Sequence, residues 1–175
     1  INNIELKEDE SSFNLVFHNK SLRIKTNLLG LFNVYNVTSF IAVIDVLNLY
    51  HPSVLTFLKK KIVIPGRMEE VQYRERRIIV DFAHTPDGVF NVLNFLKEMK
   101  KRIILVVGCG GSRDKTKRSV IGQIAVDNSH YVIFTSDNPR DEDEMTIIKD
   151  IIVDIEKENY EIVLDRKAAI KRAIS

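Results

Sequence analysis

From residue 78 to the end of the chain, short apolar runs alternate with segments of helical periodicity, and this rhythm constrains the fold more than any other feature. Four runs predict strands, at 78–82, 103–107, 131–135 and 161–164. The segments between them predict helices at about 86–100, 117–128 and 143–158, with a fourth beginning near Asp165. Strands that alternate with helices pair in parallel and are covered by helices on both faces. The sequence therefore predicts an α/β fold with a mostly parallel sheet.

The first third of the chain follows a different pattern. Two β-like runs, 13–17 and 22–25, flank the turn-prone segment His18-Asn19-Lys20 and predict a hairpin. Residues 33–49 carry apolar side chains around most of a helical circumference. We therefore expect a helix there that is largely buried.

Pro65-Gly66 interrupts the chain between these two patterns, so we place a domain boundary there, between 1–64 and 65–175. The chain begins at Ile1 in a strand-like stretch and stops at Ser175 inside a helical pattern, without a glycine cap. These ends lead us to expect a piece cut from a longer protein.

The charge balance excludes a strong general attraction to nucleic acid or to membranes, because 26 Lys and Arg residues are offset by 24 Asp and Glu residues. Cys109 is the only cysteine, which excludes an intrachain disulfide and a cysteine zinc cluster. No local base accompanies Cys109, so we do not expect it to act as a nucleophile. No apolar run approaches the roughly 20 residues of a membrane-spanning helix. We expect a cytoplasmic monomer with neither nucleic acid nor a membrane as partner.

Polar clusters follow three of the predicted strands, at 81–87, 108–115 and 137–140. In an open parallel sheet, ligands bind beyond the carboxyl ends of the strands. We therefore expect the three clusters to contribute to one edge of the sheet.

The third cluster, Asp137-Asn138-Pro139-Arg140, places both signs of charge on a turn stiffened by proline. An acceptor next to a forked donor suits a zwitterion such as the end of a free amino acid. The alternative is an ordinary Asp-Asn-Pro turn followed by a solvated arginine.

The second cluster begins with the glycine-rich segment 108–111. Arg113 stands where a dinucleotide fingerprint has its third glycine, so we reject a dehydrogenase. The cations Arg113, Lys115, Lys117 and Arg118 instead surround the start of a predicted helix. Positive charge there opposes the helix dipole and indicates an anionic partner, although a solvated basic helix start is the alternative.

Other polar residues have both a functional and a structural interpretation. Asp81 ends a strand and suits ribose hydroxyls or a turn, while His84 could cap a helix, stack on a base or relay a proton. Arg67 at the boundary could reach a phosphate or form a salt bridge. Asn33 is expected to cap the 33–49 helix, and Asn36 could offer its amide to a base.

Six segments, taken in order, resemble motifs of the Mur ligase family, and in particular of its diaminopimelate-adding members. They are Gly30 to Asn36, Gly66 to Glu69, Asp81 to Asp87, Gly108 to Arg118, Asp137 to Arg140 and Asp165 to Ile170. The resemblance implies an ATP-dependent amide ligase of peptidoglycan synthesis. ATP phosphorylates a carboxylate of UDP-MurNAc-L-Ala-D-Glu, and meso-diaminopimelate or a similar diamino diacid attacks the acyl phosphate. Residues 1–64 would then be the end of the central ATPase domain, and 65–175 a truncated, Rossmann-like C-terminal domain.

The resemblance also implies roles for individual residues. The residues implied for ATP binding are Asn33, Asn36, Arg67, Asp81, His84 and Lys115. Lys115 would lie near the transferred phosphate as the catalytic residue. The residues implied for amino-acid binding are Arg113, Asp137, Asn138 and Arg140, with the arginines on the distal carboxylate of diaminopimelate.

Parts of the family pattern are absent. The phosphate-loop pattern G-x-x-x-x-G-K-[ST] does not occur, no metal ligands are expected here, and the Mg²⁺ of such enzymes would be held mainly by the missing central-domain part. Ser112 and Ser119 stand where the family commonly has aspartate and proline. We expect the isolated piece to be inactive. The alternatives are a noncatalytic module that binds a nucleotide or zwitterion, and a related folate or polyamide ligase.

Overall fold

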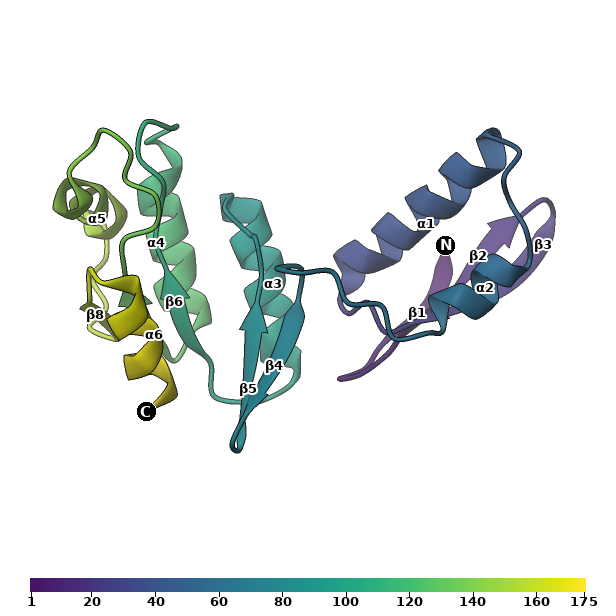
Figure 1. Cartoon of the computed structure of the whole chain (residues 1–175), viewed down its shortest axis with the longest axis horizontal. Helices are drawn as coiled ribbons and strands as arrows, with labels where there is room; N and C mark the ends of the chain where they lie inside the picture. The colour runs from purple at the N-terminus through teal and green to yellow at the C-terminus, as the bar shows by residue number, and fades with distance from the viewer. The chain divides into compact units, whose positions relative to one another are not determined.

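The computed structural model describes residues 1–175, which form two compact units, Ile1–Phe82 and Ala83–Ser175 (Figure 1). Each unit has its own hydrophobic core and is described separately. The domain boundary expected at Pro65-Gly66 stays a prediction, since packing alone does not define where an independently folding domain begins. No helix combines the length and the apolar character needed to cross a membrane.

The first unit begins with an antiparallel sheet in the order β1 (Asn2–Leu6), β2 (Ser11–Phe17) and β3 (Lys20–Thr26). Phe13 lies opposite Ile24 in the β2–β3 pair, and both side chains are buried. His18 and Asn19 turn the chain with positive φ angles of 47° and 58°, as a tight hairpin requires. The predicted hairpin is confirmed.

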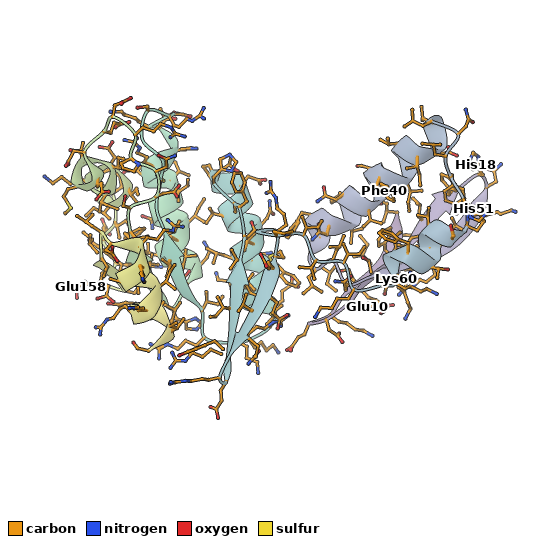
Figure 2. All side chains as sticks on the ribbon, viewed as in Figure 1. Glu10, His18, Phe40, His51, Lys60 and Glu158 are labelled. Atoms are coloured by element: carbon orange, nitrogen blue, oxygen red, sulfur yellow. The ribbon has the colours of Figure 1, made fainter.

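Helix α1 (Leu31–Val46) packs on this sheet, and the short helix α2 (Ser53–Leu58) follows it. The expectation that α1 is largely buried was wrong. Val34, Val37 and Ile41 are buried, but Val46 is 79% exposed and Phe40, labelled in Figure 2, is 43% exposed. One small sheet can cover only one side of a helix, however wide the apolar face is.

The expected N-cap of α1 was also wrong. Gly30 occupies the cap with a positive φ of 89°, which glycine adopts without strain, so the helix starts before Asn33. Asn33 consequently lies inside the first turn, where its side-chain amide donates to the Leu29 carbonyl oxygen at 2.8 Å.

A two-stranded antiparallel hairpin, β4 (Glu69–Tyr73) and β5 (Arg76–Val80), completes the first unit. The sequence predicted the run at 78–82 as the first strand of the parallel sheet. That assignment was wrong: β5 pairs with β4, with Val71 opposite Ile78. A turn at residues 74–75 brings these neighbouring strands together, and such local antiparallel pairing needs no crossover connection.

The second unit contains a parallel sheet in the order β6 (Ile104–Val107), β7 (Tyr131–Phe134) and β8 (Tyr160–Ile162). Four helices accompany it: α3 (Pro86–Glu98), α4 (Lys117–Asn128), α5 (Glu144–Ile152) and α6 (Arg166–Ile174). Helix α4 packs against α3, α5 and β7, and α6 packs against β6 and β7. The predicted α/β fold class is confirmed.

Three of these helices start at side-chain caps. Thr85 caps α3, Asp143 caps α5 and Asp165 caps α6, each accepting a hydrogen bond from a backbone N–H three residues later. Helix α5 is shorter than the predicted 143–158. The chain must leave the helix after Ile152 to bring Asn159 beside β7, where its carbonyl oxygen accepts from the Val132 N–H at 3.0 Å.

Candidate functional site

Two loops of the second unit lie against each other at the carboxyl ends of adjacent parallel strands. Residues 108–116 follow β6 and residues 135–143 follow β7, and we call the two together the two-loop site. The Gly111 N–H donates to the Asn138 carbonyl oxygen at 2.8 Å, and Arg140 Nη1 donates to the Gly111 carbonyl oxygen at 2.5 Å. A Cβ atom on residue 111 would lie 1.8 Å from the Pro139 oxygen. The loops therefore pack backbone to backbone, which only glycine permits here.

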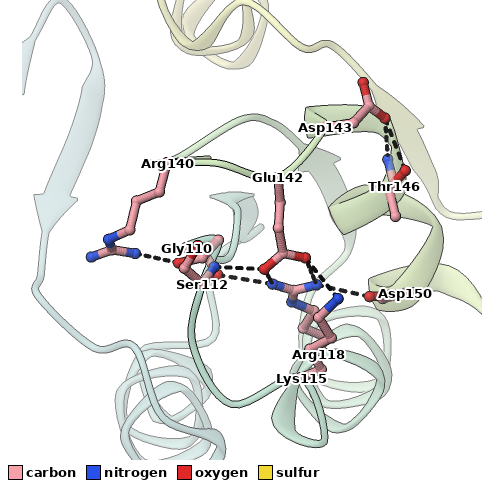
Figure 3. A network of polar contacts seen from close by, with 10 residues as sticks. Gly110, Ser112, Lys115, Arg118, Arg140, Glu142, Asp143, Thr146 and Asp150 are labelled. Atoms are coloured by element: carbon pink, nitrogen blue, oxygen red, sulfur yellow. Dashed lines mark hydrogen bonds and ion pairs between the residues drawn. The ribbon is translucent and has the colours of Figure 1, made fainter.

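The Glu142 carboxylate joins the two loops (Figure 3). Its Oε1 accepts from the Ser112 N–H at 2.5 Å and from Arg118 Nη2 at 2.9 Å. Its Oε2 accepts from Arg118 Nη1 at 3.0 Å and lies 3.0 Å from Lys115 Nζ. The hydrogen bonds from Arg118, followed by those from Lys115 and Ser112, lower the pKa of Glu142 to about 2. The carboxylate is therefore charged at neutral pH.

Arg118 is the buried partner in this network. Its side chain is 0% exposed, and it also donates to Asp150 Oδ2 at 2.8 Å and to the Gly110 carbonyl oxygen at 3.2 Å. The hydrogen bond to Glu142 is the largest cause that raises the pKa of Arg118, and burial opposes it. A buried charge is tolerated only when it is paired and hydrogen-bonded.

The anionic partner expected beside the basic helix start thus includes two carboxylates of the chain itself. Neither Glu142 nor Asp150 stands out in the sequence, because acids in a loop and on an amphipathic helix usually face solvent. No spacing signal in the sequence connects them with Arg118, which lies 24 and 32 residues away.

The structure brings all four residues expected to bind an amino acid onto the two-loop site. Arg113, Asp137, Asn138 and Arg140 are exposed, and Arg140 has a positive φ of 50°. Asp137 Oδ1 lies 3.5 Å from Arg166 Nη1, which also donates to the Ser136 carbonyl oxygen at 3.1 Å. The site therefore presents exposed groups of both charge signs.

Two lysines of the same segment have partners within the second unit. Lys115 is 61% exposed and pairs with Glu142, as described above. Lys117 Nζ donates to the His84 carbonyl oxygen at 3.1 Å and so connects the start of α4 with the segment before α3. His84 and Lys115 are the residues expected to bind ATP that belong to this unit.

The other four residues expected to bind ATP belong to the first unit, where they form two local groups. Asn36 Nδ2 donates to Asn33 Oδ1 at 3.1 Å. Asp81 Oδ2 accepts from the Met68 N–H at 2.8 Å, and the Arg67 guanidinium lies 4.7 Å from the centre of the Phe82 ring. Asp81 thus has the turn-stabilising role considered from the sequence.

Cys109 lies in the glycine-rich loop but is buried. Burial raises the pKa of its thiol to about 11, which favours the neutral thiol over the nucleophilic thiolate at physiological pH. No group of three or more His, Cys, Asp or Glu side chains is arranged to hold a metal ion.

A family model and similar proteins of known name both relate this chain to ligases. The family described as "Mur ligase, glutamate ligase domain" matches residues 66–175. The chain is 41% identical, over 98% of its length, to UDP-N-acetylmuramoyl-L-alanyl-D-glutamate--2,6-diaminopimelate ligase of Syntrophomonas wolfei. It is 38% identical, over 99% of its length, to the protein of the same name from Bacillus cereus. It spans 36% of the length of each relative.

Solved structures agree with the fold. One of a UDP-N-acetylmuramoyl-L-alanyl-D-glutamate--2,6-diaminopimelate ligase matches 98% of this chain and 36% of its own, with a TM-score of 0.62 and 36% identity. Folylpolyglutamate synthase of Mycobacterium tuberculosis, complexed with ADP, matches 98% of this chain and 39% of its own. Its TM-score is 0.80, and at 17% identity it shows the fold alone. The chain belongs to the Mur ligase family, which confirms the resemblance carried by its six motifs.

Proposed function

We propose that the chain is part of an ATP-dependent amide ligase that adds meso-diaminopimelate, or a similar diamino diacid, to UDP-MurNAc-L-Ala-D-Glu in peptidoglycan synthesis. The proposal is supported by the names of the relatives that match nearly the whole chain. The observation that carries it is the two-loop site, where Arg113 and the segment 137–140 come together through direct hydrogen bonds between their loops.

The amino acid would be recognised by charge on both sides. Arg140 uses one N–H group on the Gly111 carbonyl oxygen, which pre-orients the guanidinium and leaves other N–H groups for a substrate carboxylate. Arg113 would bind the same distal carboxylate. The Asp137 carboxylate would accept an ammonium group, in competition with Arg166 at 3.5 Å. Lysine lacks the second carboxylate, so this pair of arginines favours a diamino diacid.

ATP would transfer its γ-phosphoryl group to the dipeptide carboxylate, and the amine of the incoming amino acid would displace phosphate from the acyl phosphate. Lys115 would hold a phosphate oxygen by charge, while Asn33, Asn36, Arg67, Asp81 and His84 would bind the nucleotide. Bound Mg²⁺ would neutralise phosphate charge, as in other phosphoryl transfers. We expect the isolated chain to be inactive, because its sequence has no phosphate loop.

The Arg140→Lys variant of the full-length enzyme tests this function. A single ammonium cannot reproduce a forked contact with a carboxylate, and hydrogen bonds to charged groups contribute about 1.5–3 kcal/mol. We expect the KM for diaminopimelate to rise by about tenfold or more, with the KM for the UDP-dipeptide unchanged. Arg172→Lys is the matched control, since Arg172 pairs with Glu161 on the surface of α6.

An unchanged KM for diaminopimelate in Arg140→Lys would contradict the assigned role of the tetrapeptide. Polyglutamylation of a folate by the wild-type enzyme would instead indicate a folate ligase. Binding of the amino acid without any amide product would indicate a noncatalytic module.

A further inference from the structure

The Glu142 carboxylate does more than neutralise the buried charge of Arg118, because it also contacts other residues. Asp150 already supplies a counter-ion to Arg118 from α5, at 2.8 Å. Glu142 supplies a second one and in addition contacts the Ser112 N–H and the Lys115 ammonium. All four donors that converge on Glu142 belong to the segment 112–118, whereas Glu142 itself belongs to the other loop.

The contact with Ser112 controls the backbone next to Arg113. Ser112 has a positive φ of 50°, a conformation that residues other than glycine adopt infrequently. The Glu142–Ser112 hydrogen bond holds the residue in that conformation, and the direction in which the chain continues to Arg113 depends on it. The contact with Lys115 acts on the next functional residue of the same segment.

Glu142 also lies two residues after Arg140, on the same tight turn. The Glu142 N–H donates to the Pro139 carbonyl oxygen at 3.0 Å, so Glu142 and the tetrapeptide belong to one hydrogen-bonded turn. The Glu142 side chain is only 16% exposed and pairs with the guanidinium of Arg118, which is 0% exposed. A buried ion pair with two hydrogen bonds, such as Arg118–Glu142, is a more rigid link than an ion pair on the surface.

We propose that Glu142, held by the buried Arg118, is a positioning residue that sets the placement of Arg113 and Lys115 relative to the Asp137–Arg140 segment. The proposal rests on the proposed function and deepens it. Because both arginines would bind the distal carboxylate and Asp137 an ammonium group, the placement of the arginines relative to Asp137 selects the length of the diacid. The Glu142 carboxylate also orients Lys115, the lysine expected at the transferred phosphate. Glu142 therefore positions residues for both amino-acid binding and phosphoryl transfer.

The Glu142→Gln variant tests whether the contacts of the Glu142 carboxylate matter, because it removes an acceptor without changing the size of the side chain. Glutamine has the same shape, but its NH₂ group must replace one of the two oxygens. In one orientation NH₂ faces the donors of Arg118 and Lys115, and in the other it faces those of Ser112 and Arg118. Either way the NH₂ group opposes donors, so two of the four contacts that Glu142 makes with the segment 112–118 are lost.

Asp150→Asn is the matched control. It removes the other carboxylate on the same guanidinium, yet Asp150 lies on α5 and outside both loops. A merely structural role for the network predicts that both variants have the same kinetic parameters, whatever stability they lose.

The experiment begins with the wild-type full-length enzyme and measures diaminopimelate-dependent release of phosphate together with the amide product. Absence of product would refute the proposed function itself. With product formed, we expect Glu142→Gln to raise the KM for diaminopimelate by about tenfold or more and to lower kcat, as displacement of positioning groups does. We expect Asp150→Asn to leave the KM within about threefold of wild type.

Two further readouts keep the proposal falsifiable. Glu142→Asp keeps the charge on a shorter side chain, so we expect it to recover part of the kcat and to shift the preference among diamino diacids of different length. It also serves as the test variant if the glutamine variant does not fold. Wild-type KM and kcat in both Glu142 variants, or losses equal to those of Asp150→Asn, would overturn the proposal.

Discussion

Replacing Gly111 with alanine tests how closely the two loops of the site must pack. The added Cβ would lie 1.8 Å from the Pro139 oxygen, and ordinary contact begins at 3.4 Å, so the backbones must separate by about 1.6 Å. The 2.8 Å hydrogen bond from Gly111 to Asn138 does not survive a separation of that size. The bond from Arg140 to the Gly111 carbonyl oxygen belongs to the same contact and is lost or bent with it.

The free energy that holds the loops together should fall accordingly. Two hydrogen bonds at roughly 1 kcal/mol each give about 2 kcal/mol, before any cost of strain. In hydrogen exchange on the full-length enzyme, this loss corresponds to about 30-fold faster exchange of the amides in residues 110–113. The KM for diaminopimelate should rise in the same variant, because Arg113 and Arg140 separate.

Gly88→Ala is the control for this prediction. Its Cβ would lie 3.0 Å from the Thr85 hydroxyl and 3.5 Å from the Ala83 side chain, with no backbone atom closer than 3.7 Å, and alanine favours the helix in which residue 88 lies. Its effect on loop exchange should be negligible. If Gly111→Ala left both the exchange rates and the KM of the wild type, the close approach of the two loops would not be important for the site.

Three further predictions concern the second unit. The pKa of Glu142 is lowered from 4.5 to about 2, so the stability contributed by its ion pairs is present above pH 4.5 and is lost as the pH falls toward 2. Hydrogen exchange of the Ser112 amide across this pH range measures that loss. The same pH profile in a Glu142→Gln variant would refute the assignment of the loss to Glu142. Phe134→Ala should destabilise the fold by about 3–5 kcal/mol in denaturant unfolding, because Phe134 is fully buried against the Tyr160 ring. Val153→Ala, at an exposed position, should change the stability by less than about 0.5 kcal/mol. Cys109, with a pKa raised to about 11 by burial, should react with iodoacetamide at pH 8 far more slowly than a free thiol, and rapid alkylation of the folded protein would contradict this.

Local patterns were sufficient for much of the fold. The periodicity of residues 117–128 predicted α4 with its observed ends, and the alternation around His18 predicted the β2–β3 hairpin. Both elements depend mainly on hydrogen bonds and side-chain preferences within a short stretch of chain. The order of the polar clusters also placed Arg113 and Arg140 on one site, because the carboxyl ends of parallel strands share an edge.

The predictions from the sequence were wrong where the structure of a segment depends on which other segment packs against it. The run at 78–82 has the composition of a parallel strand, but β5 pairs with its neighbour β4. The apolar circumference of α1 exceeds what one small sheet can cover, which no count of apolar residues reveals.

The amino-acid sequence by itself determined the class of the fold, the family and the residues that carry charge on the two loops, because each of these is written in local patterns and ordered motifs. Only the tertiary structure decided that Glu142 and Arg118 join those loops. Their side chains lie 24 residues apart, and nothing local distinguishes a solvated acid from one that meets a buried guanidinium. Burial and pairing arise when the strands and helices pack, so they follow from the whole fold and not from any segment of it.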